Sequence, residues 1–148
     1  MEIRKAYSIG FTKRTAEEFF GTLKTNNIQQ LIDIRLNNVS QLAGFTKRDD
    51  LKYFLKAICG AVYHHELALA PTEDILDAYK KAHGDWLVYE KDFLNLLRER
   101  QVEKRIQRSI FDLPTVLLCS ERTSEKCHRR LVLEYLKDKW GDIEIIHL

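Results

Sequence analysis

Apolar positions follow two different spacings along the first part of the chain, and these spacings predict a strand followed by a helix. Residues 6–9 form a short apolar run that ends at Gly10, as expected of a buried strand. Thr15 and, three residues later, Glu18 then form a capping box at the start of a helix. One face of that helix is apolar at i, i+3, i+4 and i+7 and consists of Ala16, Phe19, Phe20 and Leu23.

The same kinds of apolar spacing and capping residue predict a second strand and a second helix. Residues 31–35 predict the strand, and after a polar loop Thr46 is predicted to cap a helix. The apolar face of this helix consists of Leu51, Phe54, Leu55 and Ile58. Gly60 suits the position just past the end of the helix, and residues 61–65 predict a short third strand.

The rest of the chain predicts a long helical region and two more strands. The helical region runs from Pro71 to about residue 112, with a break near Gly84. Residues 115–119 are an uninterrupted apolar run typical of a central parallel strand, and residues 125–140 and 144–148 predict a helix and a last strand. Five short strands separated mostly by helices indicate right-handed crossovers. The predicted fold class is therefore α/β, a three-layer αβα arrangement with a mostly parallel sheet of about five strands.

Composition sets limits on function. The 148 residues, 45% hydrophobic and 31% charged, suffice for one domain with its own core. No apolar run approaches the roughly 20 residues of a membrane span, and the amino end has no apolar signal region, so we expect a cytoplasmic protein with no membrane partner. A net charge of +2 does not by itself indicate nucleic-acid binding. Three cysteines are an odd number, which favours reduced thiols.

Candidate chemistry gathers where the predicted strands end. Ligands of open parallel sheets bind beyond the carboxyl ends of the strands, and polar residues stand at these positions in every predicted strand that feeds a crossover. The candidates for ligand binding there are Ser8, Lys13, Arg14, Asp33, Arg35, His65 and Cys119. His64 and His65 point to opposite sides of their strand, and His65 is favoured because it lies nearer the strand end.

Cys127 is the candidate nucleophile. With Ser124 as the N-cap of the next helix, Cys127 would occupy the N3 position, where free backbone N–H groups and the helix dipole favour a thiolate. His128 and Arg129 add positive charge beside it, and such surroundings lower the pKa of a cysteine. The alternative is a small residue packed under the helix. Cys119, deeper in its strand, leans further toward packing.

Glu121 and Arg35 each have a functional and a structural interpretation. Glu121 can act as a general acid or base or orient a histidine, or it can form a salt bridge to Arg122 or Arg129. Arg35 ends a buried strand, which is unfavourable unless it pairs with a carboxylate or a ligand anion. Asp33 is the structural partner that the sequence offers.

The sequence contains no familiar motif that would identify the reaction. Paired zinc-ligand spacings and the phosphate-binding P-loop pattern are absent from the sequence. Neither Cys119 nor Cys127 is followed six residues later by the arginine of a cysteine phosphatase. We therefore predict no metal and no cofactor, with a zinc site made of Cys119, Cys127 and His128 as a minor alternative. Residues 98–108 are locally basic and either contact a nucleic-acid backbone or form a solvated face.

The chain resembles a known family through four segments taken together. These are residues 8–12 (SIGFT), 31–35 (LIDIR), 63–67 (YHHEL) and 117–121 (LLCSE), the last followed by Cys127-His128-Arg129. In order and spacing they resemble the domain-of-unknown-function 488 family, from the first strand to the last. The family has no established reaction, but its pattern highlights the same strand-end positions. Residues 68–70 (ALA) depart from it, because many relatives carry glycine there.

The leading hypothesis is a small cytosolic enzyme acting on a phosphorylated or nucleotide-containing ligand. Arg35, Arg129 and either Lys13 or Arg14 would hold anionic groups. The reactive groups would be Cys127, His128 and Glu121. The alternative is a nucleic-acid or regulatory ligand-binding module without covalent chemistry, and a protein-interaction domain ranks last.

Overall fold

A five-stranded parallel β-sheet forms the centre of the structure, a computed structural model that describes residues 3–39, 44–121 and 124–148. The strands are β1 (Arg4–Gly10), β2 (Gln30–Asp33), β3 (Val62–His65), β4 (Thr115–Cys119) and β5 (Ile143–His147). Their order across the sheet is β3-β2-β4-β1-β5, and every neighbouring pair is parallel. The predicted α/β class with a mostly parallel sheet is confirmed.

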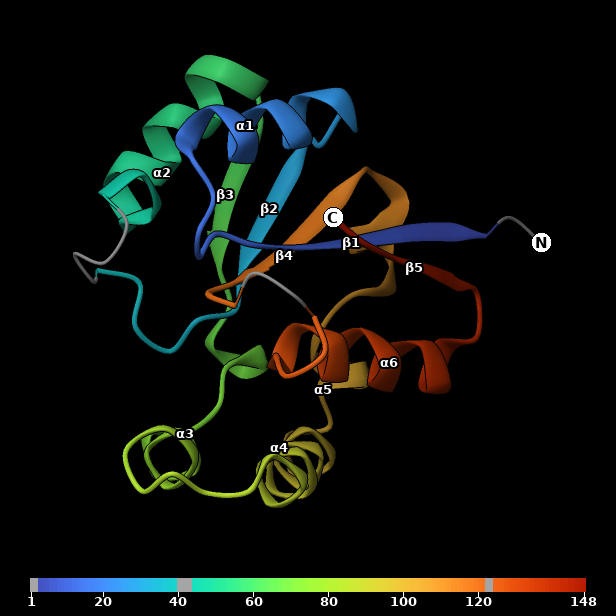
Figure 1. Ribbon diagram of the computed structural model, residues 1–148. Helices are drawn as coiled ribbons and strands as arrows, with labels where there is room; N and C mark the ends of the chain where they lie inside the picture. Colours follow the sequence, from blue (N-terminus) through green and yellow to red (C-terminus); the bar gives the residue numbers. More distant parts are fainter. Residues whose placement is uncertain (1–2, 40–43, 122–123) are drawn as a thin grey trace.

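Helices cover both faces of the sheet. They are α1 (Ala16–Thr25), α2 (Arg48–Phe54), extended by a wider turn over Leu55–Cys59, α3 (Glu73–Lys80), α4 (Trp86–Arg100), α5 (Val102–Arg105) and α6 (His128–Trp140). Short 3₁₀ turns span Gly44–Thr46, Leu67–Leu69 and Arg108–Asp112. As Figure 1 shows, α1 and α2 lie on one side of the sheet and α3 to α6 on the other. None of these helices has both the length and the apolar character needed to cross a bilayer, within the part of the chain that is described.

The central strand β4 explains why the sheet needs cover on both sides. All five of its residues are buried, and successive side chains point to opposite faces. Val116 and Leu118 join the core under α1 and α2, whereas Leu117 and Cys119 join the core under α4 and α6. The apolar run is uninterrupted because alternate residues of β4 pack into the two cores on opposite faces of the sheet.

Strand order places a crevice at the carboxyl ends of β2 and β4. The chain leaves β2 for α2 on one face, and it leaves the neighbouring β4 for α6 on the other. Two adjacent connections that part in this way open a space between them, which is where open α/β sheets bind ligands. The connections of the neighbouring pairs β3/β2 and β4/β1 part in the same way, so the topology favours the carboxyl end of the sheet but does not by itself select one pair of strands.

The sequence predicted the start of α1 correctly and the starts of α2 and α6 incorrectly. Thr15 caps α1 as expected, its hydroxyl accepting from the backbone N–H of Glu18 at 3.1 Å. Thr46 does not cap α2, because it lies inside a 3₁₀ turn and Lys47 takes the N-cap position. The last helix begins at His128, later than predicted, because Cys127 is extended (φ −137°, ψ 140°) and is itself the N-cap. The N3 position expected for Cys127 is therefore wrong.

Candidate functional site

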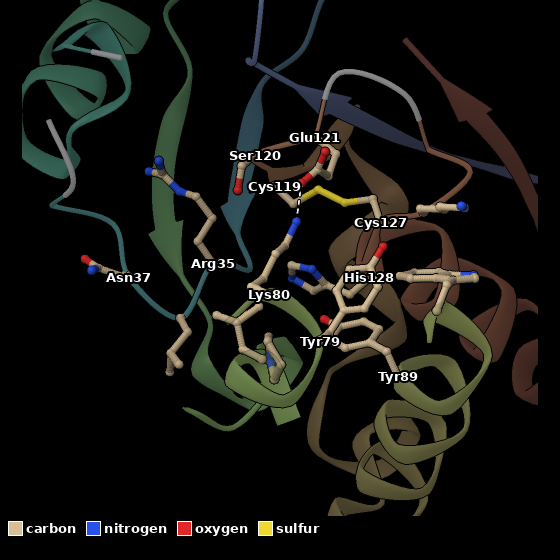
Figure 2. Close-up of a pocket in the computed structure, with 15 residues that line it drawn as sticks. Arg35, Asn37, Tyr79, Lys80, Tyr89, Cys119, Ser120, Glu121, Cys127 and His128 are labelled. Atoms are coloured by element: carbon tan, nitrogen blue, oxygen red, sulfur yellow. Dashed lines mark hydrogen bonds and ion pairs between the residues drawn. A yellow bond between two sulfur atoms is a disulfide. The ribbon is translucent and has the colours of Figure 1, made fainter. Parts of the chain in front are cut away.

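A cavity of about 250 Å³ lies where the carboxyl ends of β2 and β4 meet the start of α6. Residues 35–37 after β2, residues 119–121 at the end of β4 and residues 126–128 form one part of its wall. The other part comes from the crossover that leads from β3 to β4, namely Pro71, Leu76, Tyr79, Lys80, Trp86 and Tyr89. The crossover helices α3 and α4 thus close the crevice from the side opposite α2 (Figure 2).

Aromatic rings make one wall of this cavity. Trp86 stacks on Tyr89 with ring centroids 5.1 Å apart and planes at 24°, and Tyr79 meets Trp86 edge-on at 5.5 Å. Tyr89 is buried and continues the stack onto Phe93. Burial raises the pKa of Tyr89, so its ring stays uncharged. The sequence placed Trp86 only in the long helical region after Pro71, and its place in a cavity wall was not foreseen.

The two cysteines at the site are bonded to each other. Cys119 at the end of β4 and Cys127 before α6 form a disulfide, with Cα atoms 7.3 Å apart, and both side chains are buried. The expectation of reduced thiols is wrong for this pair, because the fold brings the end of β4 and the start of α6 within bonding reach. Cys59 keeps a free thiol, whose pKa is raised by burial. In this state Cys127 carries no thiolate, so a nucleophilic role requires reduction first.

His128 lies beside the disulfide, held by two neighbours. Its Nε2 is 2.7 Å from the carbonyl oxygen of Ile34, and its ring meets Phe93 edge-on at 5.4 Å. A carbonyl only accepts, so Nε2 carries the hydrogen and Nδ1 keeps its lone pair. Burial, supported by the nearby charge of Arg129, lowers the pKa of His128 to about 4. The imidazole is therefore neutral near pH 7.

Glu121 meets a lysine across the cavity. Lys80 Nζ donates to Glu121 Oε1 at 2.7 Å, and both side chains remain about half exposed, at 49% and 42%. Figure 2 shows this pair together with the Cys119–Cys127 bond and His128. Of the two predicted salt-bridge partners, Arg129 donates to the main-chain oxygen of Glu121 at 2.6 Å, and Arg122 lies outside the described residues. The carboxylate stays within reach of a ligand in the cavity.

Arg129 lies behind the site rather than in it. Its side chain is 0% exposed and donates to Ser8 Oγ at 3.0 Å, Cys119 Sγ at 3.2 Å and the Glu121 carbonyl oxygen. Burial and the neighbouring charge of Arg14 lower the pKa of Arg129 to about 10. Arg129 and Ser8 are absent from the described lining of the cavity. They connect β1, β4 and the loop after β4.

Asp33 and Arg35 form the buried pair that was the structural alternative. Arg35 donates from Nε to Asp33 Oδ1 at 2.9 Å and from Nη2 to Oδ2 at 2.8 Å. Tyr63 donates to the same carboxylate at 2.7 Å, and the Thr46 carbonyl accepts from Arg35 Nη2. The guanidinium also lies 5.3 Å from the ring centre of Phe11. Arg35 lines the cavity while its charge is balanced by Asp33.

Besides Ser8 and Arg129, three further predicted ligand-binding residues lie away from the cavity. Lys13 is exposed on the loop after β1, and Arg14 donates to the carbonyl oxygen of Leu148 at 2.9 Å. His65 Nε2 lies 2.7 Å from the Arg35 carbonyl oxygen, in a separate hollow that also contains His64. None of them is among the described residues that line the cavity. The structure thus brings together Arg35, Cys119, Glu121, Cys127 and His128 from the predicted set.

The basic segment 98–108 is largely engaged in the fold. Arg100 donates to the carbonyl oxygens of residues 67, 68 and 70, and desolvation lowers its pKa. Arg108 pairs with the buried carboxylate of Asp142 just before β5, at the amino end of the sheet. Arg98 donates to Asn95. Arg100 and Arg108 are thus committed to internal partners, and Lys104 and Arg105 remain exposed, so the segment presents fewer cations to a nucleic-acid backbone than its sequence suggests.

The family comparison covers most of the chain. Residues 15–136 match the family described as domain of unknown function DUF488, a range that starts at the N-cap of α1 and ends within α6. The SIGFT segment of β1, on which the resemblance also rested, lies outside this range. No curated protein and no solved structure matches the chain. The family prediction is confirmed: the chain belongs to the domain of unknown function DUF488 family.

Proposed function

We propose that this chain is a small cytoplasmic enzyme that binds a nucleotide-containing ligand in the cavity between β2 and β4. The observation that carries the proposal is the pairing, in one cavity, of a ring wall with cations and reactive groups. Trp86 and Tyr79 offer faces on which a base can stack. The side chains of Lys80 and Lys126 are exposed at the same cavity and suit a phosphate group.

The reactive groups of this enzyme are the ones that line the cavity. Glu121 carries a carboxylate at the cavity, where it can accept or donate a proton. Cys119, Cys127 and His128 lie together on the same wall. Three cysteines cannot all pair, and Cys59 keeps a free thiol. A cytoplasmic location requires the Cys119–Cys127 bond to open, because the cytoplasm keeps thiols reduced.

Thermal unfolding with a ligand panel tests the binding step. Nucleoside mono- and diphosphates should raise the melting temperature, by roughly 5–10 °C at a concentration one hundred times Kd. Ribose 5-phosphate, which lacks the base, should have a much smaller effect because it cannot stack. A panel in which no nucleotide changes the melting temperature would overturn the proposal.

The two tryptophans of the chain supply a matched pair of variants. Trp86→Leu removes a stacking face from the cavity wall and should weaken nucleotide binding about 5- to 150-fold, as expected for about 1–3 kcal/mol of base stacking. Trp140→Leu removes an equally half-buried indole that packs on Phe111 away from the cavity. It should leave binding unchanged. Equal losses in both variants would show a general loss of stability instead of a lost contact.

A nucleic-acid-binding module is the competing function. It would bind oligonucleotides with an affinity that falls steeply as salt rises, and Arg105→Ala would weaken that binding while Trp86→Leu would not. The internal bonds of Arg100 and Arg108 argue against this surface. Strong oligonucleotide binding with a steep salt slope would favour the module over the enzyme.

A further inference from the structure

We propose that Cys119, Cys127 and His128, with the two cysteines reduced, bind one zinc ion on the wall of the cavity. Two sulfurs and one imidazole nitrogen are a known zinc ligand set, and with only three protein ligands the fourth position stays open. The inference goes beyond the ligand proposal and does not depend on it, because it rests only on the donor atoms and their surroundings.

The donor atoms are already gathered. The ligand atoms of Cys119, Cys127 and His128 all lie within 4.8 Å of one another. On a tetrahedral zinc ion with bonds of about 2.3 Å to sulfur and about 2.0–2.1 Å to nitrogen, ligand atoms stand about 3.3–3.8 Å apart. Shifts of the order of 1–2 Å therefore suffice to enclose an ion.

The backbone separation of the cysteines suits a shared ion. Their Cα atoms are 7.3 Å apart, which exceeds the roughly 4.4–6.8 Å that disulfides usually span. Two cysteines that ligate the same zinc hold their sulfurs farther apart than two bonded sulfurs, by nearly 2 Å. The wider backbone spacing leaves room for that change without moving β4 against α6.

His128 and Cys119 already form hydrogen bonds to residues that would surround the zinc ligands without binding the ion themselves. The Nε2–H of His128 is held by the Ile34 carbonyl oxygen at 2.7 Å, which leaves Nδ1 as the nitrogen with a lone pair. Zinc-bound histidines almost always donate their other N–H to such a partner. Arg129 Nη1 donates to Cys119 Sγ at 3.2 Å and is itself held by Ser8 and Glu121. These bonds orient two of the three donors before any ion arrives.

The open fourth position would face the cavity, since the three donor residues share its wall. Cys119, Cys127 and His128 all belong to its lining, as does Glu121. A water molecule bound there would be activated by the ion, and the carboxylate of Glu121 could take its proton. Within the described parts of the chain, no further cysteine, histidine or carboxylate joins the three donors. This is the arrangement of a catalytic zinc site and not of a closed structural one.

Reduction precedes metal binding. Two thiols of a cellular dithiol reductant supply two electrons that break the Cys119–Cys127 bond and two protons that go to the sulfurs, and the reductant becomes a disulfide. Zinc then displaces the two thiol protons, which leave to solvent. Two thiolates and one Zn²⁺ sum to zero charge, so the ion can occupy a buried position beside the guanidinium of Arg129.

Titration with zinc alone, without any cavity ligand, tests the site. The full chain, reduced and freed of metal by a chelator, should bind one Zn²⁺ and release about two protons near neutral pH. Cys119→Ser and Cys127→Ser should each weaken binding by more than about 100-fold, and His128→Ala by at least about 10-fold, since outer-shell losses alone cost about 10- to 100-fold. Cys59→Ser, the matched control, should bind zinc like the wild type.

A second measurement needs no variant. Alkylation of the reduced wild-type protein, mapped by mass spectrometry, should show Cys119 and Cys127 protected by zinc and Cys59 unaffected. Absence of stoichiometric binding, or equal reactivity of all three thiols with and without zinc, would overturn the metal site. Because the zinc titration contains no cavity ligand, its failure leaves the nucleotide proposal standing on its own melting-temperature test.

Discussion

Gly10, the last residue of β1, offers the sharpest test of how tightly the site is packed. A Cβ atom added at this position would lie 1.4 Å from the carbonyl oxygen of Glu121 and 2.9 Å from Arg129 Nη1. The obstacle is mainly backbone, so a side-chain rotation cannot relieve it. Gly10→Ala therefore forces the loop after β4 away from β1.

The structure sets the size of the effect. Carbon atoms of this kind essentially never approach closer than 3.0 Å, so the Glu121 carbonyl must retreat by about 1.6 Å. The hydrogen bond from Arg129, 2.6 Å long, is then lost. A buried hydrogen bond from a charged donor contributes about 1.5–3 kcal/mol. With strain in the neighbouring Thr12–Ser120 backbone bond, the free energy of unfolding should fall by about 2–4 kcal/mol.

Urea unfolding and thermal melting measure this loss. For a chain of this length the melting temperature should fall by about 4–16 °C. Gly21→Ala is the matched control: Gly21 lies on the exposed face of α1, and no described atom lies within 4 Å of its added Cβ. That change should raise stability by about 0.5–1 kcal/mol, because alanine favours a helix interior. The reasoning is refuted if Gly10→Ala is as stable as the wild type.

Three further predictions concern bonds outside the cavity. Asp33→Ala leaves the buried charge of Arg35 without its carboxylate and should cost about 3–5 kcal/mol in urea unfolding, with a loss under 1 kcal/mol contradicting the pair's role. Thr15→Ala removes the N-cap of α1 and should cost about 1 kcal/mol, and no change would show that the cap is replaced by water. The Arg108 guanidinium bonded to Asp142 holds the pKa of that carboxyl below its usual range. Asp142→Asn should therefore destabilise the chain at pH 7, and its difference from the wild type in acid titrations of stability should shrink as the pH falls below about 4; a constant difference would argue against the ion pair.

Much of the fold follows from local pattern. Strand β4 was predicted with its observed bounds because a strand buried on both faces is apolar at every position. The break near Gly84 also appears, between α3 and α4. The end of α4 had no signal: Gln101 adopts a left-handed conformation (φ 51°) without being glycine or asparagine. Such a turn is imposed by packing, and packing is not visible in a single sequence.

The candidate site, like the fold, could be predicted where it depends on local pattern and not where it depends on tertiary packing. Sequence reasoning predicted Arg35, Cys119 and Glu121 at strand ends, and these three line the cavity, whereas Ser8 and His65 from other strand ends do not. It missed the aromatic wall and Lys80, because the crossover between β3 and β4 must fold back before these side chains meet residue 121. The signal available was the series of aromatic residues Tyr79, Trp86 and Tyr89 in the predicted helical region, to which no role in the site was assigned.

Three consecutive residues at the start of α6 explain why the carboxyl ends of the central strands stay together. Cys127 is bonded to Cys119 at the end of β4, His128 to the Ile34 carbonyl just after β2, and Arg129 to Ser8 in β1. Successive residues at a helix start project in directions about 100° apart, so one short segment reaches three neighbouring strands. Cys119, Cys127 and His128, which take part in the first two of these contacts, also line the cavity. A zinc ion bound by the first two residues would replace the disulfide as the link between β4 and α6, so metal loading should increase stability and assemble the site in a single step.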